Sequence, residues 1–153
     1  MVTMNRRTFG RLGLAGLGVL AAPAVLRAQT GTILIGFHAP LSGAQEALGT
    51  YALNGFLSAV DEINARGGIL NKPIEVVVRD DKSRPSDSAA VIREFLGNGI
   101  QLVVGAGLAQ PTLSAQGVVA ERDVVYMAVI ASNYAITHES FNDRTFRLFP
   151  SAW

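Results

Sequence analysis

The sequence predicts an α/β fold, a doubly wound and mostly parallel sheet with helices on both faces. Short apolar segments of strand length alternate along the chain with longer segments of helical periodicity. The apolar segments contain few polar residues, which is typical of strands buried on both faces of a parallel sheet. Glycine and proline residues separate the segments, and right-handed crossovers would connect the strands.

The first half of the predicted sheet contains two strands and one helix. The first strand is TILIGFHA, residues 32–39, and the polar, glycine-punctuated segment LSGAQEALG after it is expected to be a loop. The next segment is an amphipathic helix with apolar residues every three or four positions: Leu53, Phe56, Leu57, Val60 and Ile63. Gly67 and Gly68 would end this helix. Pro73 then leads into a β-branched strand, IEVVV, that ends near Arg79.

The second half continues the alternation. The expected elements, in chain order, are a helix near Ser86 to Leu96, a strand from Ile100 to Gly105, a helix in LAQPTLSAQGVVAER, a strand from Val124 to Ile130 and a fifth strand in TFRLF. In an open parallel sheet, ligands bind beyond the carboxyl ends of the strands. The candidate site loops are therefore residues 40–49, 105–112 and 130–137.

The first 28 residues have the layout of an export signal of the twin-arginine type. RRTF precedes an uncharged apolar segment that ends in small residues, and we expect cleavage after Ala28. The segment is too short to span a bilayer comfortably, although a membrane anchor is the alternative. The whole chain has 13 Lys and Arg residues and 12 Asp and Glu residues; four arginines lie in the signal, so residues 29–153 would carry a net charge of about −3. No basic patch indicates nucleic-acid binding.

No catalytic or metal-binding set is recognisable in the sequence. The chain has no cysteine, which excludes disulfides, thiolate catalysis and cysteine-based zinc sites. His38 ends the first strand and His138 follows the fourth, and the spacing joins neither to a carboxylate and a nucleophile. His38 is therefore expected to be a packing or surface residue. We expect no catalytic residue, no metal and no cofactor.

GAGLAQ, residues 105–110, partly matches a dinucleotide-binding fingerprint. Gly105 and Gly107 follow a strand and precede a helix, but Gln110 occupies the position of the third glycine. The segment also follows the third strand instead of the first. A Rossmann-type oxidoreductase is thus an alternative that the pattern supports only in part.

Two adjacent carboxylates, Asp80 and Asp81, end the second strand. We expect them to accept hydrogen bonds from loop N–H groups and from Lys82 or Arg84, which would stop the strand. A hard-cation site or an acid–base pair is the alternative. No third oxygen-rich segment is positioned by sequence to complete a metal site.

Five segments are informative when they are taken in order: IGFHAPLSG, ALNGFLSAVDEINARGGILNKPIEVVVRDDKSRP, GIQLVVGAG, VVYMAVIASNYAIT and FRLFPS. Together they resemble the solute-binding proteins of branched-chain amino acid ABC transporters, the leucine/isoleucine/valine-binding family. The resemblance covers nearly all of residues 29–153. It implies an incomplete amino-terminal lobe of a type I periplasmic binding protein, whose two α/β lobes are joined by a hinge and close on a solute.

The resemblance also implies five ligand-binding positions: Leu48, Ala109, Gln110, Ile130 and Ser132. Ser132 matches a hydroxyl residue that binds the α-groups of the amino acid, and Ile130 matches a position that contacts ligand through its backbone. Ala109 stands where many members have a serine, and Leu48 stands where branched-chain binders have an aromatic residue. These two departures leave amides, urea, aromatic acids and other small carboxylates open as solutes.

By the same resemblance, the protein would be the extracytoplasmic substrate-binding component of an ABC importer and not an enzyme. It would reach the periplasm by the twin-arginine or Sec route, act as a monomer when full length, and deliver solute to a permease in the inner membrane. A ligand-sensing receptor domain with the same fold is a further alternative. Members of this family are more than twice as long as this chain. We therefore expect the 153-residue chain alone to bind solute weakly or not at all and to have a sheet edge liable to aggregate.

Overall fold

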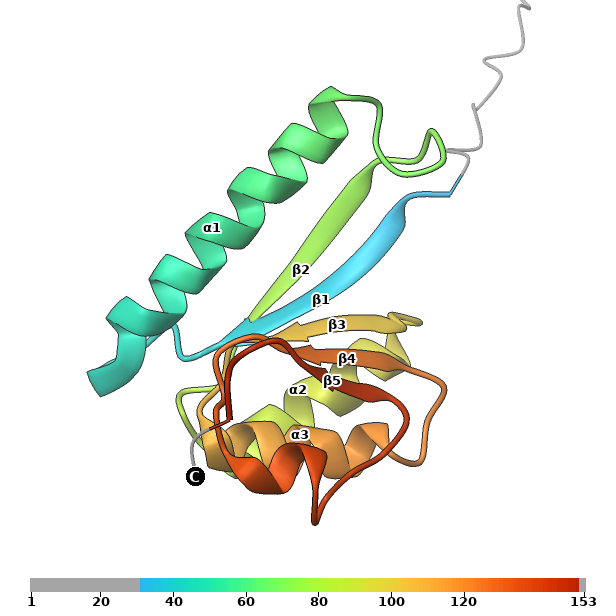
Figure 1. Ribbon diagram of the computed structural model, residues 1–153. Helices are drawn as coiled ribbons and strands as arrows, with labels where there is room; N and C mark the ends of the chain where they lie inside the picture. Colours follow the sequence, from blue (N-terminus) through green and yellow to red (C-terminus); the bar gives the residue numbers. More distant parts are fainter. Residues whose placement is uncertain (1–30, 152–153) are drawn as a thin grey trace, which may run out of the picture. The chain divides into compact units, whose positions relative to one another are not determined.

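The computed structural model describes residues 31–151, which form a five-stranded parallel sheet flanked by helices. The strands are β1 (Ile33–Ala39), β2 (Ile74–Asp80), β3 (Leu102–Gly105), β4 (Val125–Ala128) and β5 (Thr145–Arg147). They lie in the order β2-β1-β3-β4-β5, and each neighbouring pair is parallel (Figure 1). The predicted fold class is confirmed. The predicted export signal, residues 1–28, lies outside the described residues.

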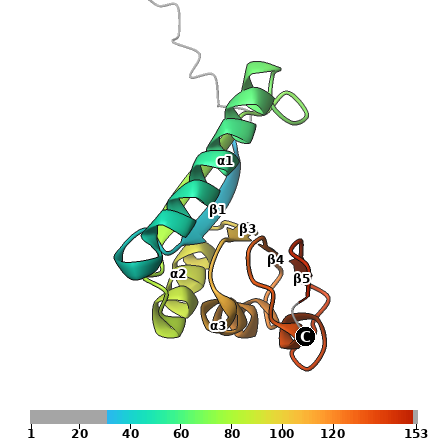
Figure 2. The same ribbon diagram turned by 60° about the vertical axis from the view of Figure 1, so that its left-hand side comes forward.

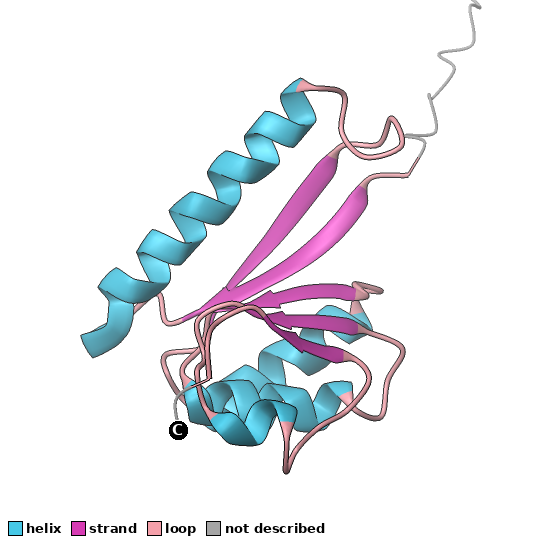
Figure 3. Cartoon of the chain, in the orientation of Figure 1, coloured by secondary structure: helices cyan, strands magenta, loops and turns pink. Residues whose placement is uncertain are grey.

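Three α-helices cover the two faces of the sheet: α1 (Glu46–Ala65), α2 (Pro85–Gly97) and α3 (Ala109–Val119). α1 packs on β1 and β2 from one side, whereas α2 and α3 pack together on the other side (Figure 1, Figure 2). Two 3₁₀ turns, η1 (Gly43–Gln45) and η2 (Tyr134–Thr137), follow β1 and β4. The loops that follow β1, β3 and β4 come together at one end of the sheet, because the strands are parallel (Figure 3).

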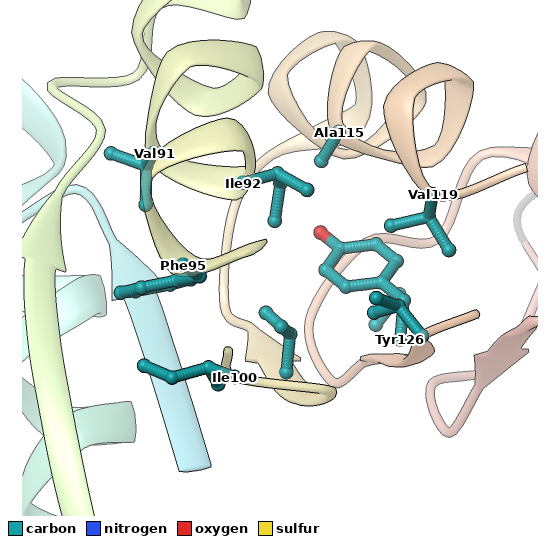
Figure 4. Packing of buried hydrophobic residues seen from close by; sticks show 10 residues of the cluster. Val91, Ile92, Phe95, Ile100, Ala115, Val119 and Tyr126 are labelled. Atoms are coloured by element: carbon teal, nitrogen blue, oxygen red, sulfur yellow. The ribbon is translucent and has the colours of Figure 1, made fainter. Parts of the chain in front are cut away.

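The core beneath α2 and α3 is built from aliphatic and aromatic side chains of these helices and of β3 and β4. Ile92 and Phe95 of α2 and Tyr126 of β4 are fully buried in it (Figure 4). Phe95 also packs over Gly36 of β1, where a Cβ atom would lie 2.6 Å from the ring. Burying a side chain of this size contributes about 1.5–3 kcal/mol to folding. This core therefore accounts for the close attachment of α2 to the sheet.

The core beneath α1 uses the apolar stripe that the sequence predicts. The ring of Phe56 stacks on the ring of Phe37 in β1, with centroids 5.2 Å apart. Leu53 packs against the same cluster, which includes the fully buried Ala39 and Ala106 at the carboxyl ends of β1 and β3. The start of α1 is thereby held close to the candidate site loops.

The turn between α1 and β2 is held by the side chain of Asn64. Its amide nitrogen donates to the carbonyl of Ile74 at 2.9 Å, and its amide oxygen accepts from the N–H of Ile74 at 2.8 Å. Gly67 and Gly68 follow with φ values of 97° and 76°, in the left-handed region that commonly ends a helix. The predicted end of the helix at these glycines is confirmed.

The loop predicted at residues 41–49 is wrong in its second half, because α1 already begins at Glu46. The η1 turn leads directly into the helix, and Glu46 in the first turn interacts favourably with the helix dipole. Gly49 resembles a loop glycine in the sequence, but it lies inside α1, where a side chain would collide with the carbonyl of Pro40. Leu48 consequently lies on a helix and not in a loop.

The last three strands are shorter than the sequence predicts. Ile100 lies in the turn that follows α2, where its N–H bonds to the carbonyl of Phe95 at 2.9 Å, and β3 begins only at Leu102. β4 spans four residues, and β5 pairs with β4 alone, so the ladder ends at Arg147. The apolar composition of these segments predicted the strands, whereas the residues of the neighbouring strands that are available for pairing decided the strand lengths.

Apolar side chains of β3, β4 and β5 are exposed on the face that α1 covers only in part. The strand register places Val104, Met127 and Phe146 in one row, and Phe146 at the end of the row is 51% exposed. Leu102 and Val125 pair with each other two positions earlier on the same face of the sheet, and they are 40% and 39% exposed. Leu148, directly after β5, is 61% exposed. We call the following residues the uncovered face: Leu102, Val125, Phe146 and Leu148.

Candidate functional site

The candidate site lies at the carboxyl ends of β1 and β3, where the chain leaves neighbouring strands in opposite directions. After β1 the chain turns to α1 on one face of the sheet, and after β3 it turns to α3 on the other face. Such a divergence leaves a crevice in open α/β sheets, and ligands bind there. The loop after β4 joins this edge from the next strand.

Asp80 holds the loop after β1 in place. Its Oδ1 accepts from the N–H groups of Leu41 and Lys82, both at 2.8 Å, and its Oδ2 accepts from the hydroxyl of Ser42 at 2.5 Å. Burial raises the pKa of this carboxyl, but the hydrogen bonds together outweigh burial and hold the pKa of Asp80 below its usual value. The charged carboxylate thus ties the β1 loop to the β2 loop.

Asp81 points into the protein and is fully buried. Its Oδ1 accepts from the backbone N–H two residues later at 2.9 Å, and its Oδ2 lies 2.9 Å from Nδ1 of His38. The prediction that both aspartates accept from loop N–H groups is confirmed. Lys82 bonds to Asp80 through its backbone N–H and its charge helps to lower the pKa of Asp80, whereas the exposed side chains of Lys82 and Arg84 pair with Asp87. The ammonium or guanidinium group of either side chain would have to lose its water to reach the fully buried carboxylate of Asp81.

His38 joins a carboxylate and a hydroxyl, which the sequence spacing did not indicate. Its Nε2 lies 3.0 Å from the hydroxyl of Tyr126, while Nδ1 faces Asp81, and all three side chains are fully buried. Burial raises the pKa of the Tyr126 phenol well above its usual range, and Thr112 only partly opposes this effect. The phenol therefore stays protonated. The arrangement is a buried hydrogen-bond network and not a nucleophile facing a substrate.

The two glycines of GAGLAQ are explained by this packing. A Cβ atom at Gly105 would lie 2.6 Å from Cε2 of Tyr126, closer than carbon atoms of separate residues approach. A Cβ atom at Gly107 would lie 3.1 Å from Oδ2 of Asp81. Both positions thus favour glycine for reasons that involve no nucleotide.

The start of α3 presents backbone N–H groups at the site. Leu108 precedes the helix in an extended conformation, and no side chain caps it. The bond from the N–H of Thr112 to the carbonyl of Leu108, at 2.9 Å, opens the helix, so the N–H groups of Ala109 and Gln110 have no acceptor within it. A helix start of this kind is suited to binding a carboxylate.

Four of the five predicted ligand positions lie at this edge. Ala109 and Gln110 begin α3, and Ile130 and Ser132 lie in the loop after β4. Ala109 and Ile130 are half-buried, whereas Gln110 is exposed. Leu48 lies apart from them in the first turn of α1, where it is 36% exposed. It reaches the same end of the sheet because α1 starts from the loop after β1.

Arg147 of β5 supports the loop that carries Ser132, and the sequence did not reveal this role. Its guanidinium donates to the carbonyls of Asn133 at 2.9 Å and Ser132 at 3.4 Å, and to Oγ of Ser151 at 3.2 Å. The only signal in the sequence is a charged residue inside the apolar segment TFRLF. Its partners lie 14 and 15 residues earlier, a separation that no local pattern indicates.

One surface hollow adjoins the candidate site and another lies away from it. The first has a volume of about 400 Å³ and is lined by η1 and the start of α1, including Gly43, Thr50 and Tyr51. The second, of about 660 Å³, lies between α2 and α3. Within residues 31–151, no three His, Asp or Glu residues gather in a group that could hold a metal ion, and no helix has the length and apolar character to cross a bilayer.

Residues 32–153 match the family model described as periplasmic binding protein. The chain belongs to the periplasmic binding protein family. Within this family, it is 35% identical over 100 residues to the Leu/Ile/Val-binding protein BraC3 of Rhizobium johnstonii. This match covers 65% of this chain and 27% of the relative. It is also 34% identical over 108 residues to the Leu/Ile/Val-binding protein homolog 2 of Brucella abortus, which covers 69% of this chain and 28% of the relative.

A solved structure of this family is similar in fold and in sequence. It is the branched-chain amino acid transporter substrate binding protein LivJ from Streptococcus pneumoniae, in complex with isoleucine, with a TM-score of 0.74 and 34% identity. The match covers 79% of this chain and 34% of the LivJ chain. The present periplasmic binding protein chain therefore spans about a third or less of the length of the relatives that it matches. The predicted family is confirmed.

Proposed function

We propose that this chain forms part of the extracytoplasmic substrate-binding component of an ABC importer. Its solute would be a branched-chain amino acid or a related small amino acid, carboxylate or amide. The observation that carries the proposal is the sheet edge at which the loops after β1, β3 and β4 meet, in a chain that matches the periplasmic binding protein family over residues 32–153. Relatives at about 35% identity have Leu/Ile/Val-binding names.

In this proposal, backbone groups make the principal polar contacts with the solute. The N–H groups of Ala109 and Gln110 would bind its carboxylate at the start of α3. The hydroxyl of Ser132 and the backbone of Ile130 would bind the α-groups, and Leu48 would contact the side chain. A serine at position 109 would add a hydroxyl hydrogen bond to a charged group, so its absence predicts weaker carboxylate binding than in relatives that have it.

Function would consist of solute capture and not of catalysis. Both ring nitrogens of His38 lie within hydrogen-bonding distance of buried partners, and Asp80 bonds to its own loops. These groups are thus committed to the scaffold. The export signal at residues 1–28, the periplasmic location and an inner-membrane permease as partner belong to the same proposal, and a full-length protein would act as a monomer.

Ligand-observed NMR tests the proposal at the low affinity expected for one wall of a cleft. A solute pocket usually buries about 70–90% of its ligand, and an open sheet edge buries less. We expect saturation transfer from the 153-residue chain to the methyl groups of L-leucine, L-isoleucine and L-valine, with a Kd on the order of millimolar. Ser132→Ala should weaken the transfer.

Ser140→Ala is the matched control, because Ser140 is exposed and its backbone carbonyl, not its hydroxyl, accepts from Gln116. Equal transfer from both variants would contradict the assigned role of Ser132. Absence of transfer to branched-chain amino acids, amides and small carboxylates would overturn the proposed function. Quenching of reduced nicotinamide fluorescence by the chain would favour the dinucleotide-binding alternative.

A further inference from the structure

We propose that Asp81, His38 and Tyr126 form a relay of hydrogen bonds that positions the loop between β3 and α3 for solute binding. We call these three residues the His38 network. The inference rests on the proposed function in one respect, namely that this loop presents the N–H groups of Ala109 and Gln110 to the solute. The positioning itself is a property of the chain without ligand.

The donors and acceptors of the His38 network can be assigned from its chemistry. Each of its three side chains is 0% exposed. The carboxylate of Asp81 can only accept, so Nδ1 of His38 donates to it across 2.9 Å. Nε2 of the ring lies 3.0 Å from the hydroxyl of Tyr126, which as a phenol can either donate or accept there. Both ring nitrogens of His38 therefore have a partner, whichever direction the bond to Tyr126 takes.

The His38 network spans the sheet across the strand that leads into the loop. His38 pairs with Gly105 of β3 in the strand register, and Tyr126 pairs with Val103 on the far side of the same strand. The phenol of Tyr126 reaches His38 by crossing over Gly105, where a side chain would collide with its ring. The rings of His38 and Tyr126 lie nearly parallel, with centroids 5.7 Å apart and 9° between their planes. Gly105 is therefore held beneath a pair of linked side chains from β1 and β4.

The loop that follows Gly105 contacts the network at two further points. The N–H of Ala106 donates to the carbonyl of His38 at 2.8 Å. The next residue, Gly107, packs against Asp81, and its carbonyl accepts from the hydroxyl of the fully buried Thr112 at 3.2 Å. A change in the His38 network would thus reach the backbone two residues before Ala109. Ala106 and Gly107 are both buried, and no side chain caps α3 after them.

Hydrogen exchange of the 153-residue chain tests this role by comparing Tyr126→Phe with Val119→Ala. The first variant removes one hydroxyl and keeps the ring, so Nε2 of His38 loses its partner. Val119 is also fully buried in the core beneath α3, but it makes no side-chain hydrogen bond. We expect Tyr126→Phe to accelerate exchange of the backbone amide of Ala106, which donates to the carbonyl of His38, about five- to tenfold relative to the amides of β2, the effect of losing one hydrogen bond. Val119→Ala should accelerate exchange without singling out this loop.

The ring nitrogens of His38 provide a second measurement on the unchanged chain. Residues 31–151 contain two histidines, His38 and the exposed His138, so the signals can be separated. A long-range ¹H–¹⁵N spectrum at neutral pH should show His38 with a protonated Nδ1, the nitrogen that faces Asp81. Because this spectrum needs no variant, it tests the inference even if Tyr126→Phe fails to fold.

The inference is overturned if Nδ1 of His38 carries no proton at neutral pH, or if Tyr126→Phe and Val119→Ala accelerate exchange of the Ala106 amide equally. Both measurements are made without solute. A chain with the expected exchange pattern that transfers no saturation to any solute would contradict the proposed function alone. A chain that binds leucine but shows no selective loop exchange would contradict the positioning role alone.

Discussion

Replacement of Asp80 by asparagine tests the clamp that holds the loop after β1. The substitution keeps the shape of the side chain and one acceptor oxygen, but it removes the negative charge. Three groups depend on this carboxylate: the N–H of Leu41, the N–H of Lys82 and the hydroxyl of Ser42. The variant should therefore loosen the loop that leads into α1.

The magnitude follows from the number and exposure of these hydrogen bonds. A hydrogen bond to a charged group contributes about 1.5–3 kcal/mol when it is buried. Here the bond to Leu41 is partly buried, whereas the bonds to Ser42 and Lys82 are exposed and water can replace them. Since asparagine still accepts one bond, we expect a loss of about 1 kcal/mol at pH 7. With a urea m-value of about 1–3 kcal/mol/M, the midpoint would fall by roughly 0.3–1 M.

The pH dependence of this loss has a defined sign. The pKa of Asp80 in the folded chain is lower than its ordinary value of 3.8. Its charge therefore stabilises the fold fully above the unfolded pKa, and this contribution disappears as the pH falls through the folded pKa. Urea unfolding at pH 7, 5 and 3 should show the same difference between wild type and Asp80→Asn at pH 7 and 5 and a smaller one at pH 3.

Asp61→Asn is the control, because Asp61 is exposed on α1, far along the helix from the β1 loop. It should shift the midpoint little at any of these pH values. The reasoning about Asp80 would be refuted by a difference at pH 7 no larger than that of Asp61→Asn. A full-sized difference that persists at pH 3 would refute the role of the charge.

Three further variants test the core, the space beside Gly105 that the ring of Tyr126 fills, and the exposed apolar surface. Ile92→Ala should destabilise the chain by about 2–5 kcal/mol in urea, because the side chain is fully buried and leaves a cavity. Gly105→Ala should cost about 1–3 kcal/mol through overlap with Tyr126. Combined serine substitutions at Phe146 and Leu148 should lower dye binding by exposed apolar surface, and self-association in light scattering, because these residues belong to the uncovered face.

Each of these predictions has a matched comparison. Gly117→Ala places a methyl group in open space on α3 and should be neutral or stabilising. An equal loss of stability in Gly105→Ala and Gly117→Ala would contradict the steric conflict between position 105 and Tyr126. Leu70→Ser removes a side chain that is 85% exposed outside the uncovered face. If it lowers dye binding as much as the pair does, the uncovered face has no special role. A loss below 1 kcal/mol for Ile92→Ala would contradict close packing beneath α2.

Much of the fold could be predicted because its signals are local. Uninterrupted apolar segments indicated buried parallel strands, and the three- and four-residue spacing of Phe56 and its neighbours indicated the face of α1 that packs on Phe37. The glycine pair after α1 indicated its end. The lengths of β3 and β5 could not be predicted, since they depend on where α2 ends and on how much of β4 is available for pairing.

The candidate site was predictable only as a set of loops. Parallel strands place their carboxyl ends together, so the loop positions followed from the strand assignments. The beginning of α1 at Glu46 and the support of Ser132 by Arg147 did not follow, because both depend on contacts between segments far apart in the chain.

By itself, the sequence determined the class of fold and the order of strands and helices along the chain, because periodicity and turn residues act over a few positions. Only the tertiary structure decided which polar groups meet. His38, Asp81 and Tyr126 are separated by 43 and 88 positions along the chain, and each has an ordinary local context. They become partners because the sheet order sets β1 beside both β2 and β3, and because a glycine in β3 leaves room for a phenol to cross.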